Sequence, residues 1–143
     1  MLEKFDIAVI GGGIAGISVA ARLSKHAKVG LWEQEDFLAH HSSSRSAAVF
    51  ISDYGNSDVC ELNLITFSEL QSKYPNILKQ RGLMSLEKKA ETGKFNKHAK
   101  SLGLSPISVV EAKEKASIID LKSVKQAAWR DDVFDIDTDL LIQ

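Results

Sequence analysis

The sequence is poor in cysteine and proline, and it carries almost no net charge. Its 143 residues include one cysteine, Cys60, and two prolines, and the net charge at pH 7 is −1. A single cysteine excludes an internal disulfide framework, and we expect Cys60 to be a small buried hydrophobic residue within a helix. The near-neutral charge disfavours a nucleic-acid-binding surface. Because 44% of the residues are hydrophobic, we expect a folded chain.

Long apolar runs and metal-ligand spacings are also missing. No apolar run is long enough to cross a bilayer. The amino terminus does not resemble a signal peptide, because Glu3 and Asp6 interrupt its apolar residues and glycines follow at once. These features favour a cytoplasmic protein without a transmembrane segment. No metal site is expected, because no recognised ligand spacing includes any of the four histidines, His26, His40, His41 and His98.

The most informative feature that is present is a glycine-rich turn. Gly11, Gly13 and Gly16 have the G-x-G-x-x-G spacing of dinucleotide-binding βαβ units. Gly11 allows a sharp turn out of a strand, Gly13 lets a pyrophosphate approach the backbone, and Gly16 lets the helix pack close to the strands. A helix that begins near Ile14 would point its unpaired N–H groups and its positive dipole end at the phosphates.

The residues around the glycines complete the pattern. Residues 5–10 predict a strand, residues 14–23 a helix and residues 28–32 a second strand, which Glu33 follows. An acid at this place accepts hydrogen bonds from the adenosine ribose and repels a 2′-phosphate. The alternative is a structural glycine turn without a ligand. The combined pattern favours a dinucleotide site and leaves open whether FAD or NAD is bound.

A serine-rich loop follows the second predicted strand. Hydroxyl and backbone N–H groups at the start of a helix suit a pyrophosphate or a ribityl chain, and the Arg45 guanidinium suits an anion. We expect that helix to begin at Ala47 and Ala48. The alternative is a solvent-exposed linker in which Ser46 is a capping residue. The loop reads His40-His41-Ser42-Ser43-Ser44-Arg45-Ser46-Ala47-Ala48.

Together, the glycine turn, Glu33 and the loop from His41 to Ala48 resemble the amino-terminal part of the D-amino-acid-oxidase-like (DAO) FAD-dependent oxidoreductases. The chain is most similar to the branch of bacterial D-arginine dehydrogenase and glycine oxidase. The similarity continues through Tyr54 and Gly55 to residues 135–138, which resemble the start of a helix in the substrate half.

The resemblance implies an α/β fold with two parts. One is a Rossmann-like FAD/NAD(P)-binding βαβ domain, and the other is the beginning of an α+β substrate domain that this chain leaves incomplete. Residues 1–55 would form the βαβ unit and the Ser/Arg loop. Residues 56–143 would form the remainder of the FAD domain and the start of a substrate-side layer.

The resemblance also implies FAD as the cofactor. Glu33 would hold the adenosine ribose, and Gln34 would lie at the adenine edge. The glycine turn would cradle the pyrophosphate, and the serine loop would line the diphosphate, ribityl and isoalloxazine groups. The turn and loop residues concerned are Gly11, Gly13, Ile14, Ala15, Gly16, Ser42, Ser43, Arg45, Ser46, Ala47 and Ala48.

Tyr54 matches a tyrosine on a mobile loop over the substrate pocket of D-arginine dehydrogenase, which makes it a candidate lid residue. An ordinary loop aromatic is the alternative. Val49 departs from the family pattern, because that enzyme has a polar histidine beside the flavin. Residues 81–86 also lack the glutamate that would receive a cationic substrate side chain. These departures argue against D-arginine as the substrate, and no residue of this chain is assigned a catalytic role.

The resemblance therefore predicts the FAD-binding portion of an oxidoreductase. Such an enzyme oxidises the CH–NH bond of a D-amino acid or related amine by hydride transfer to flavin N5. Family members are substantially longer than this chain, so we expect it to be inactive without a carboxyl-terminal half, a second subunit or a split-gene partner. The alternatives are a non-catalytic truncated fragment and a short NAD-binding Rossmann protein, against which the Ser/Arg loop argues.

The remaining sequence predicts alternating helices and strands with no internal repeat. Helical patterns cover 57–73, 91–102 (ended by Gly103), 111–116 and the apolar residues 140–143. Strands are predicted at 83–87, 107–110 and 126–130. Because part of the family's sheet is absent, an open sheet edge and an apolar patch are expected to stay exposed.

Overall fold

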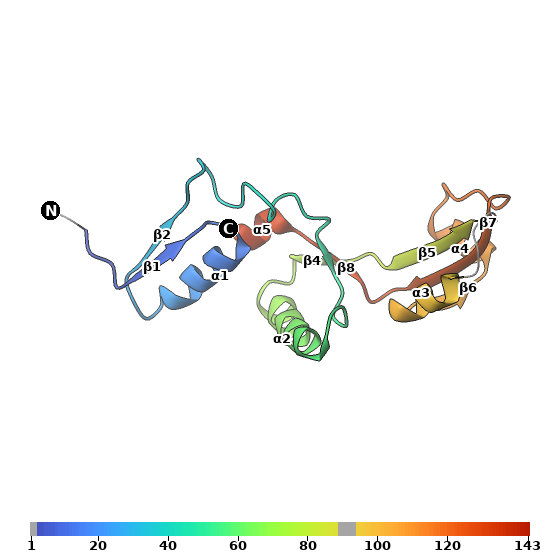
Figure 1. The fold of residues 1–143 in the computed structure, drawn as a ribbon, viewed down its shortest axis with the longest axis horizontal. Helices are drawn as coiled ribbons and strands as arrows, with labels where there is room; N and C mark the ends of the chain where they lie inside the picture. The colour runs from blue at the N-terminus through green and yellow to red at the C-terminus, as the bar shows by residue number, and fades with distance from the viewer. Residues whose placement is uncertain (1–2, 89–93) are drawn as a thin grey trace. The chain divides into compact units, whose positions relative to one another are not determined.

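The computed structural model describes residues 3–88 and 94–143 (Figure 1). The chain divides into two compact units. The first, which we call the nucleotide unit, comprises Met1–Ala48 and Ile136–Gln143. The second, which we call the middle unit, comprises Val49–Asp135. No helix in the described ranges is long and apolar enough to cross a membrane.

The nucleotide unit is built on the predicted βαβ arrangement. Strand β1 (Ile7–Ile10) and strand β2 (Val29–Trp32) pair in parallel, and helix α1 (Ile14–Leu23) connects them. The predicted strand, helix and second strand are therefore confirmed, with α1 having the predicted bounds. The last helix, α5 (Thr138–Ile142), also belongs to this unit, and the Asp137 side chain caps it by accepting a hydrogen bond from the Leu140 N–H.

The nucleotide unit buries few side chains. None of the ten residues of α1 is buried, and the Ile10 side chain at the end of β1 is 80% exposed. The Trp32 ring packs edge-on against Phe5, with 5.1 Å between ring centroids. A two-stranded sheet with one lightly packed helix buries little apolar surface, which is a weak basis for independent stability.

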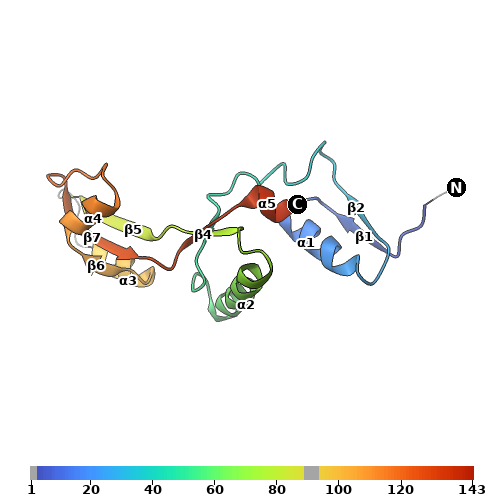
Figure 2. The ribbon, with the colours of Figure 1, turned by 180° about the vertical axis from the view of Figure 1, so that it is seen from behind.

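The described residues of the middle unit form two small sheets. Figure 2 shows strands β5, β6 and β7 of one of them. One has the strand order β3–β8–β4, and the other is antiparallel with the order β5–β7–β6. The helices that the structure describes beside them are α2 (Ser57–Lys73), α3 (Phe95–Ser101) and α4 (Val109–Lys115). The strands are β3 (Val49–Phe50), β4 (Leu78–Gln80), β5 (Leu83–Lys88), β6 (Ser105–Ile107), β7 (Val124–Arg130) and β8 (Phe134–Ile136).

Strand β7 carries the core of the middle unit on both of its faces. Ala128 packs with Phe95 and Ala99 of α3, whereas Ala127 packs with Ala112 of α4 and with Ile119. Successive strand residues point to opposite faces of a sheet, so α3 and α4 cover opposite faces of this sheet. Both alanines are almost fully buried, and their small size lets the helices lie close to the strand.

Most of the predicted elements are confirmed. Helix α2 has the predicted bounds, and strands β5 and β7 cover 83–87 and 126–130. The helix predicted at 91–102 is observed as α3 and ends before Gly103, which has φ +65°. Residues 91–93 of that prediction lie outside the described residues. Cys60 is partly rather than fully buried, and its thiol donates a hydrogen bond to the Gly55 carbonyl.

The strand predicted over 107–110 has the wrong bounds. Strand β6 ends at Ile107, and α4 begins at Val109, because Ser108 and Glu111 form a capping box. The Ser108 Oγ accepts the Glu111 N–H at 3.1 Å, and a Glu111 carboxylate oxygen accepts the Ser108 N–H at 2.7 Å. Hydrogen bonding of the Glu111 carboxylate to the Ser108 N–H, and also to the Ser108 side chain, lowers the pKa of Glu111. The capping box therefore begins a helix within the apolar residues from which the strand was predicted.

The helix expected to begin at Ala47 and Ala48 is also absent. Ala48 has φ +50°, and its N–H donates to the Ser46 Oγ at 3.0 Å in a tight turn. The chain then continues as strand β3, whose Phe50 pairs with Phe134 of β8. Ser46 therefore stabilises a turn before a strand and does not cap a helix. Strands β3, β4 and β8 had no counterpart in the predicted elements.

Two neighbouring isoleucines provide a test of this core. Ile119 is 6% exposed and packs against α4 and β7, whereas Ile118 is 94% exposed. We expect Ile119→Ala to lower the free energy of unfolding of the middle unit by about 2–5 kcal/mol, because it leaves a cavity. Ile118→Ala should change that free energy by about 0.5 kcal/mol or less. Equal effects in urea unfolding would contradict the described core.

Candidate dinucleotide site

The glycine turn joins β1 to α1 through a very close backbone contact. Gly11 has φ +101°, a left-handed conformation that favours glycine, and its N–H donates to the Trp32 carbonyl of β2 at 2.8 Å. A Cβ on Gly16 would lie 2.0 Å from the Gly11 carbonyl oxygen. The start of α1 can therefore lie on the turn only because residue 16 has no side chain.

The Glu33 carboxylate binds the same turn from the end of β2. One of its oxygens accepts the Gly12 N–H at 2.5 Å, and the other accepts the N–H groups of Gln34 at 2.8 Å and Glu35 at 3.1 Å. The bonds from Gly12 and Glu35 are the main reason that the pKa of Glu33 is lowered. An ionised carboxylate has about four acceptor positions, so it can also accept hydroxyl groups.

Ser43 brings the serine loop onto the start of α1. Its Oγ accepts the Ile14 N–H at 3.0 Å. The N-cap residue of α1 is Gly13, which has no side chain with which to cap the helix. Ser43, 29 positions after Ile14, caps the helix instead. A Cβ on Gly13 would lie 3.3 Å from the Ser43 hydroxyl oxygen. The Ala39 N–H, which donates to the Gly12 carbonyl at 2.8 Å, adds a second link.

The remaining candidate cofactor-binding residues also lie in the nucleotide unit, and most of them are exposed. Gln34 is exposed and donates from its side-chain amide to Glu35. Ala48 is half-buried, and Ala15 on the first turn of α1 is exposed. The exposed candidates of the loop are Ser42, Arg45, Ser46 and Ala47. Tyr54, the candidate lid residue, is exposed in the middle unit.

The structure also gathers three side chains that no sequence spacing indicated. A carboxylate oxygen of Glu35 and one ring nitrogen each of His40 and His41, atoms of the kind that bind metal ions, lie within 4.8 Å of one another. The Glu35 carboxylate and the His41 Nε2 are 2.9 Å apart, and the Phe37 ring packs edge-on against His40. Hydrogen bonds from Gln34 and His41 lower the pKa of Glu35. These contacts fasten the residues after β2 to the start of the serine loop.

The residues of this site fit an adenine dinucleotide. The first turn of α1 offers backbone N–H groups and its positive dipole end to a pyrophosphate, and Gly13 leaves room beside the backbone. The Glu33 carboxylate is ionised and held at the rim of the turn, where ribose hydroxyl groups can donate to it. Ser43 contributes a hydroxyl group at the same place.

Gly16→Ala tests the close contact at the turn. The added Cβ overlaps the Gly11 carbonyl, so α1 must move away from the turn. If FAD binds only to the close form of the turn, restoring that form costs about 1–3 kcal/mol, so the FAD affinity should fall by about 5-fold to 150-fold. Ser18→Thr adds one carbon at an exposed position of the same helix and should leave the Kd unchanged. Equal Kd values in a flavin fluorescence titration would contradict the prediction.

A pH series tests the role of Glu33. Because the pKa of Glu33 in the folded chain is below the ordinary value of 4.5, its stabilising contribution is complete above pH 4.5. That contribution is lost as the pH falls through the lowered pKa. The thermal unfolding midpoint should therefore fall less steeply in Glu33→Gln than in the unmodified chain below pH 4.5.

Asp36→Asn removes an exposed carboxylate three positions further on and serves as the control. Its thermal unfolding midpoint should fall below pH 4.5 as steeply as that of the unmodified chain. If Glu33→Gln keeps the same steepness as Asp36→Asn, the carboxylate of Glu33 does not hold the turn.

Comparison with known proteins gives the family and the fold of this chain. The model of the FAD dependent oxidoreductase (DAO) family matches residues 6–143. Among solved structures, L-proline dehydrogenase from P. horikoshii is similar with a TM-score of 0.73 and 24% identity, over 99% of this chain and 40% of that one. Glycine oxidase from Bacillus cereus has a TM-score of 0.73 and 19% identity, over 97% of this chain and 43% of that one.

A third neighbour is L-α-glycerophosphate oxidase from Mycoplasma pneumoniae, whose structure has FAD bound. It has a TM-score of 0.76 and 16% identity, over 99% of this chain and 41% of that one. At these identities the structural likeness shows the fold. The chain spans about two fifths of the length of these neighbours. With the family match over nearly the whole sequence, this chain belongs to the DAO family of FAD-dependent oxidoreductases.

Proposed function

We propose that this chain is the FAD-binding portion of an oxidoreductase that oxidises the CH–NH bond of an amino acid or a related amine. The observation that carries the proposal is the convergence of Glu33 and Ser43 on the glycine turn at the start of α1. The two residues come from separate segments that follow α1, and they accept backbone N–H groups two residues apart. This arrangement suits a ligand with a ribose next to a pyrophosphate.

Each residue has a distinct part in this proposal. Glu33 accepts the adenosine ribose hydroxyls, Gln34 lies at the adenine edge, and the first turn of α1 holds the pyrophosphate. The loop residues Ser42, Ser43, Arg45, Ser46, Ala47 and Ala48 line the rest of the cofactor. When bound, the flavin accepts hydride at N5 from the carbon next to the substrate nitrogen. The residues named here bind and orient the cofactor, and none of them is assigned a catalytic role.

The part of the chain after the serine loop is assigned to the substrate side. We assign residues 1–55 to FAD binding and residues 56–143 to the remainder of the FAD domain and the start of a substrate layer. Tyr54 is the residue of this chain that we expect to contact the substrate. The structural neighbours are more than twice as long, and we expect turnover to require a carboxyl-terminal half as well. A cytoplasmic location is part of the proposal.

The choice of an amine substrate rests on the kinds of neighbour. They include a proline dehydrogenase, a glycine oxidase and an L-amino acid deaminase from Proteus vulgaris, all named for amino-acid substrates. The glycerophosphate oxidase shows the same fold in an enzyme named for a different substrate. The D-configuration rests on the sequence resemblance alone, and Val49 argues against D-arginine.

Two alternatives predict different behaviour. A short NAD-binding Rossmann protein would bind NAD in preference to FAD, and membership of an FAD-dependent family argues against it. A non-catalytic fragment would keep the glycine turn without supporting turnover. The thin packing of the nucleotide unit is the observation that favours the fragment, because it leaves α1 without a buried residue.

Anaerobic reduction of the flavin tests the proposed reaction. The chain is combined with FAD and with a carboxyl-terminal half supplied as a second polypeptide, and the visible flavin band is followed. We expect proline, glycine or a D-amino acid to bleach the band, and α-glycerophosphate to leave it unchanged. The chain with FAD alone should show no bleaching. Bleaching by α-glycerophosphate but by none of the amines would contradict the proposal.

A further inference from the structure

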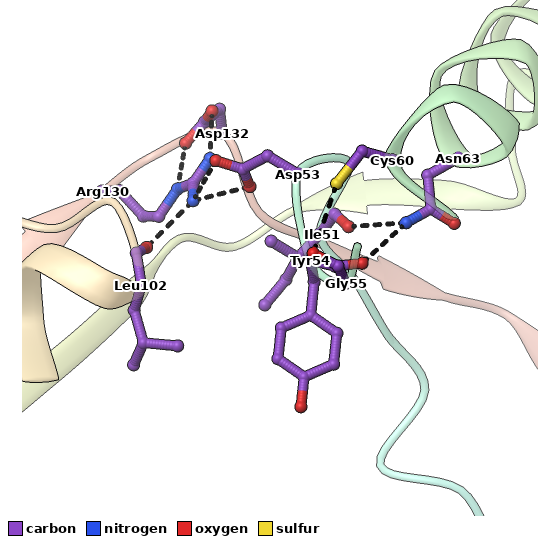
Figure 3. A network of polar contacts seen from close by, with 9 residues as sticks. All are labelled: Ile51, Asp53, Tyr54, Gly55, Cys60, Asn63, Leu102, Arg130 and Asp132. Atoms are coloured by element: carbon purple, nitrogen blue, oxygen red, sulfur yellow. Dashed lines mark hydrogen bonds and ion pairs between the residues drawn. The ribbon is translucent and has the colours of Figure 1, made fainter. Parts of the chain in front are cut away.

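The Arg130 side chain, at the end of β7, bonds to three other residues of the middle unit (Figure 3). Its Nε and Nη2 donate to the two carboxylate oxygens of Asp132, at 2.6 and 2.7 Å. Its Nη1 donates to both carboxylate oxygens of Asp53, at 2.9 and 3.1 Å, and to the Leu102 carbonyl at 2.9 Å. The side chain is only 9% exposed, so these bonds replace those that water would make.

The surrounding backbone is shaped to admit the Arg130 guanidinium. Leu102 is the C-cap residue of α3, and its carbonyl lies where a helix leaves acceptors unpaired. A Cβ on Gly103 would lie 2.7 Å from the Arg130 Nη1, so the absence of a side chain there makes room. The two-pronged bond to Asp132 raises the pKa of Arg130 and lowers that of Asp132. Arg130 is therefore a fixed cation.

Asp53 lies in the loop between β3 and α2, next to Tyr54, and α2 holds that loop from the other side. The Asn63 side-chain amide donates to the carbonyls of Tyr54 at 3.1 Å and Ile51 at 3.5 Å. The Cys60 thiol donates to the Gly55 carbonyl at 3.8 Å. The loop is thus fastened to α2 through backbone carbonyls, and to β7 and α3 through the carboxylate of Asp53.

The Tyr54 side chain is left out of this network. It is 66% exposed, and in Figure 3 its ring extends away from the bonded groups. A large aromatic residue that is exposed on a loop with its backbone held on both sides is suited to contacting a ligand, because little conformational freedom is lost when the ligand binds. The bonds of Asn63 and Cys60 do not involve charge. The link between Asp53 and Arg130 is the ionic one.

We propose that Arg130 is a positioning residue for Tyr54, and that it acts through Asp53 to hold the loop of residues 51–56 in one conformation. This inference rests on the proposed function, in which Tyr54 contacts the substrate, and it assigns the loop a preformed rather than a mobile state. Arg130 touches no reacting group. Its effect on a ligand passes through Asp53 and the backbone of Tyr54.

Amide hydrogen exchange on the whole chain tests the ionic link. Asp53→Asn keeps the shape of the side chain and removes its charge. We expect exchange in residues 51–56 to become about threefold to tenfold faster, as for a partly exposed ion pair made of several charge-assisted bonds. Added salt should speed exchange of these residues in the unmodified chain but not in Asp53→Asn, because salt screens only the ionic link. Asp53→Glu should retain most of the protection.

Two further measurements complete the test. Asp131→Asn removes an exposed carboxylate from the turn beside Arg130 and should leave exchange in the loop unchanged. Fluorotyrosine NMR, with Tyr74→Phe to assign the signal of Tyr54, should show a shifted or sharpened Tyr54 signal in Asp53→Asn. A general loss of structure would instead speed exchange in β7 and α4 as well, and would overturn the proposal.

Unchanged exchange in the loop of Asp53→Asn would also overturn the proposal, as would a Tyr54 signal that does not respond. None of these readouts requires flavin or turnover. If the chain fails to oxidise amines while exchange responds as expected, the proposed function fails and the link from Arg130 to Tyr54 stands. If amines are oxidised while exchange does not respond, the link fails alone.

Discussion

The close approach of Gly16 to the Gly11 carbonyl is the constraint on which the nucleotide unit depends. Only glycine at position 16 allows α1 to begin directly above the turn, because a Cβ at that position would lie 2.0 Å from the carbonyl oxygen. Once the helix begins there, the N–H groups of the turn and of the first helical residue need acceptors. Glu33 and Ser43 supply them from the two segments that follow, at Gly12 and Ile14. The turn, the end of β2 and the serine loop therefore form one site.

The middle unit is organised differently, around strand β7. Two alanines of β7 let helices pack on both faces of the sheet. At the end of β7, the Arg130 side chain donates hydrogen bonds to Asp132, to Asp53 and to the carbonyl at the end of α3. The apolar part of the strand stabilises the unit, while its polar end holds the loop that carries Tyr54. Neighbouring residues of β7 therefore pack the core of the unit and position the loop that carries Tyr54.

The sequence predicted those elements whose patterns are local. The βαβ unit, α2 and the central strands follow from glycine spacing and apolar periodicity, and the acid at position 33 follows from the same fingerprint. The helix expected at Ala47 failed because Ser46 and a left-handed Ala48 turn the chain into a strand. The Ser108–Glu111 capping box gave a local signal that would have placed the start of α4 correctly.

The contacts that periodicity could not predict are those between distant segments. Strands β3, β4 and β8 have two or three residues each, so they are defined by their partners and not by a pattern. The bonds of Ser43 to Ile14 and of Arg130 to Asp53 span 29 and 77 positions.

The central claim is that the glycine turn, Glu33 and the serine loop form an FAD site. Its most direct test is the visible spectrum of the purified chain with FAD, after gel filtration. A flavin band that elutes with the chain is the predicted result. A folded, monodisperse chain that elutes without flavin at saturating FAD would contradict the account.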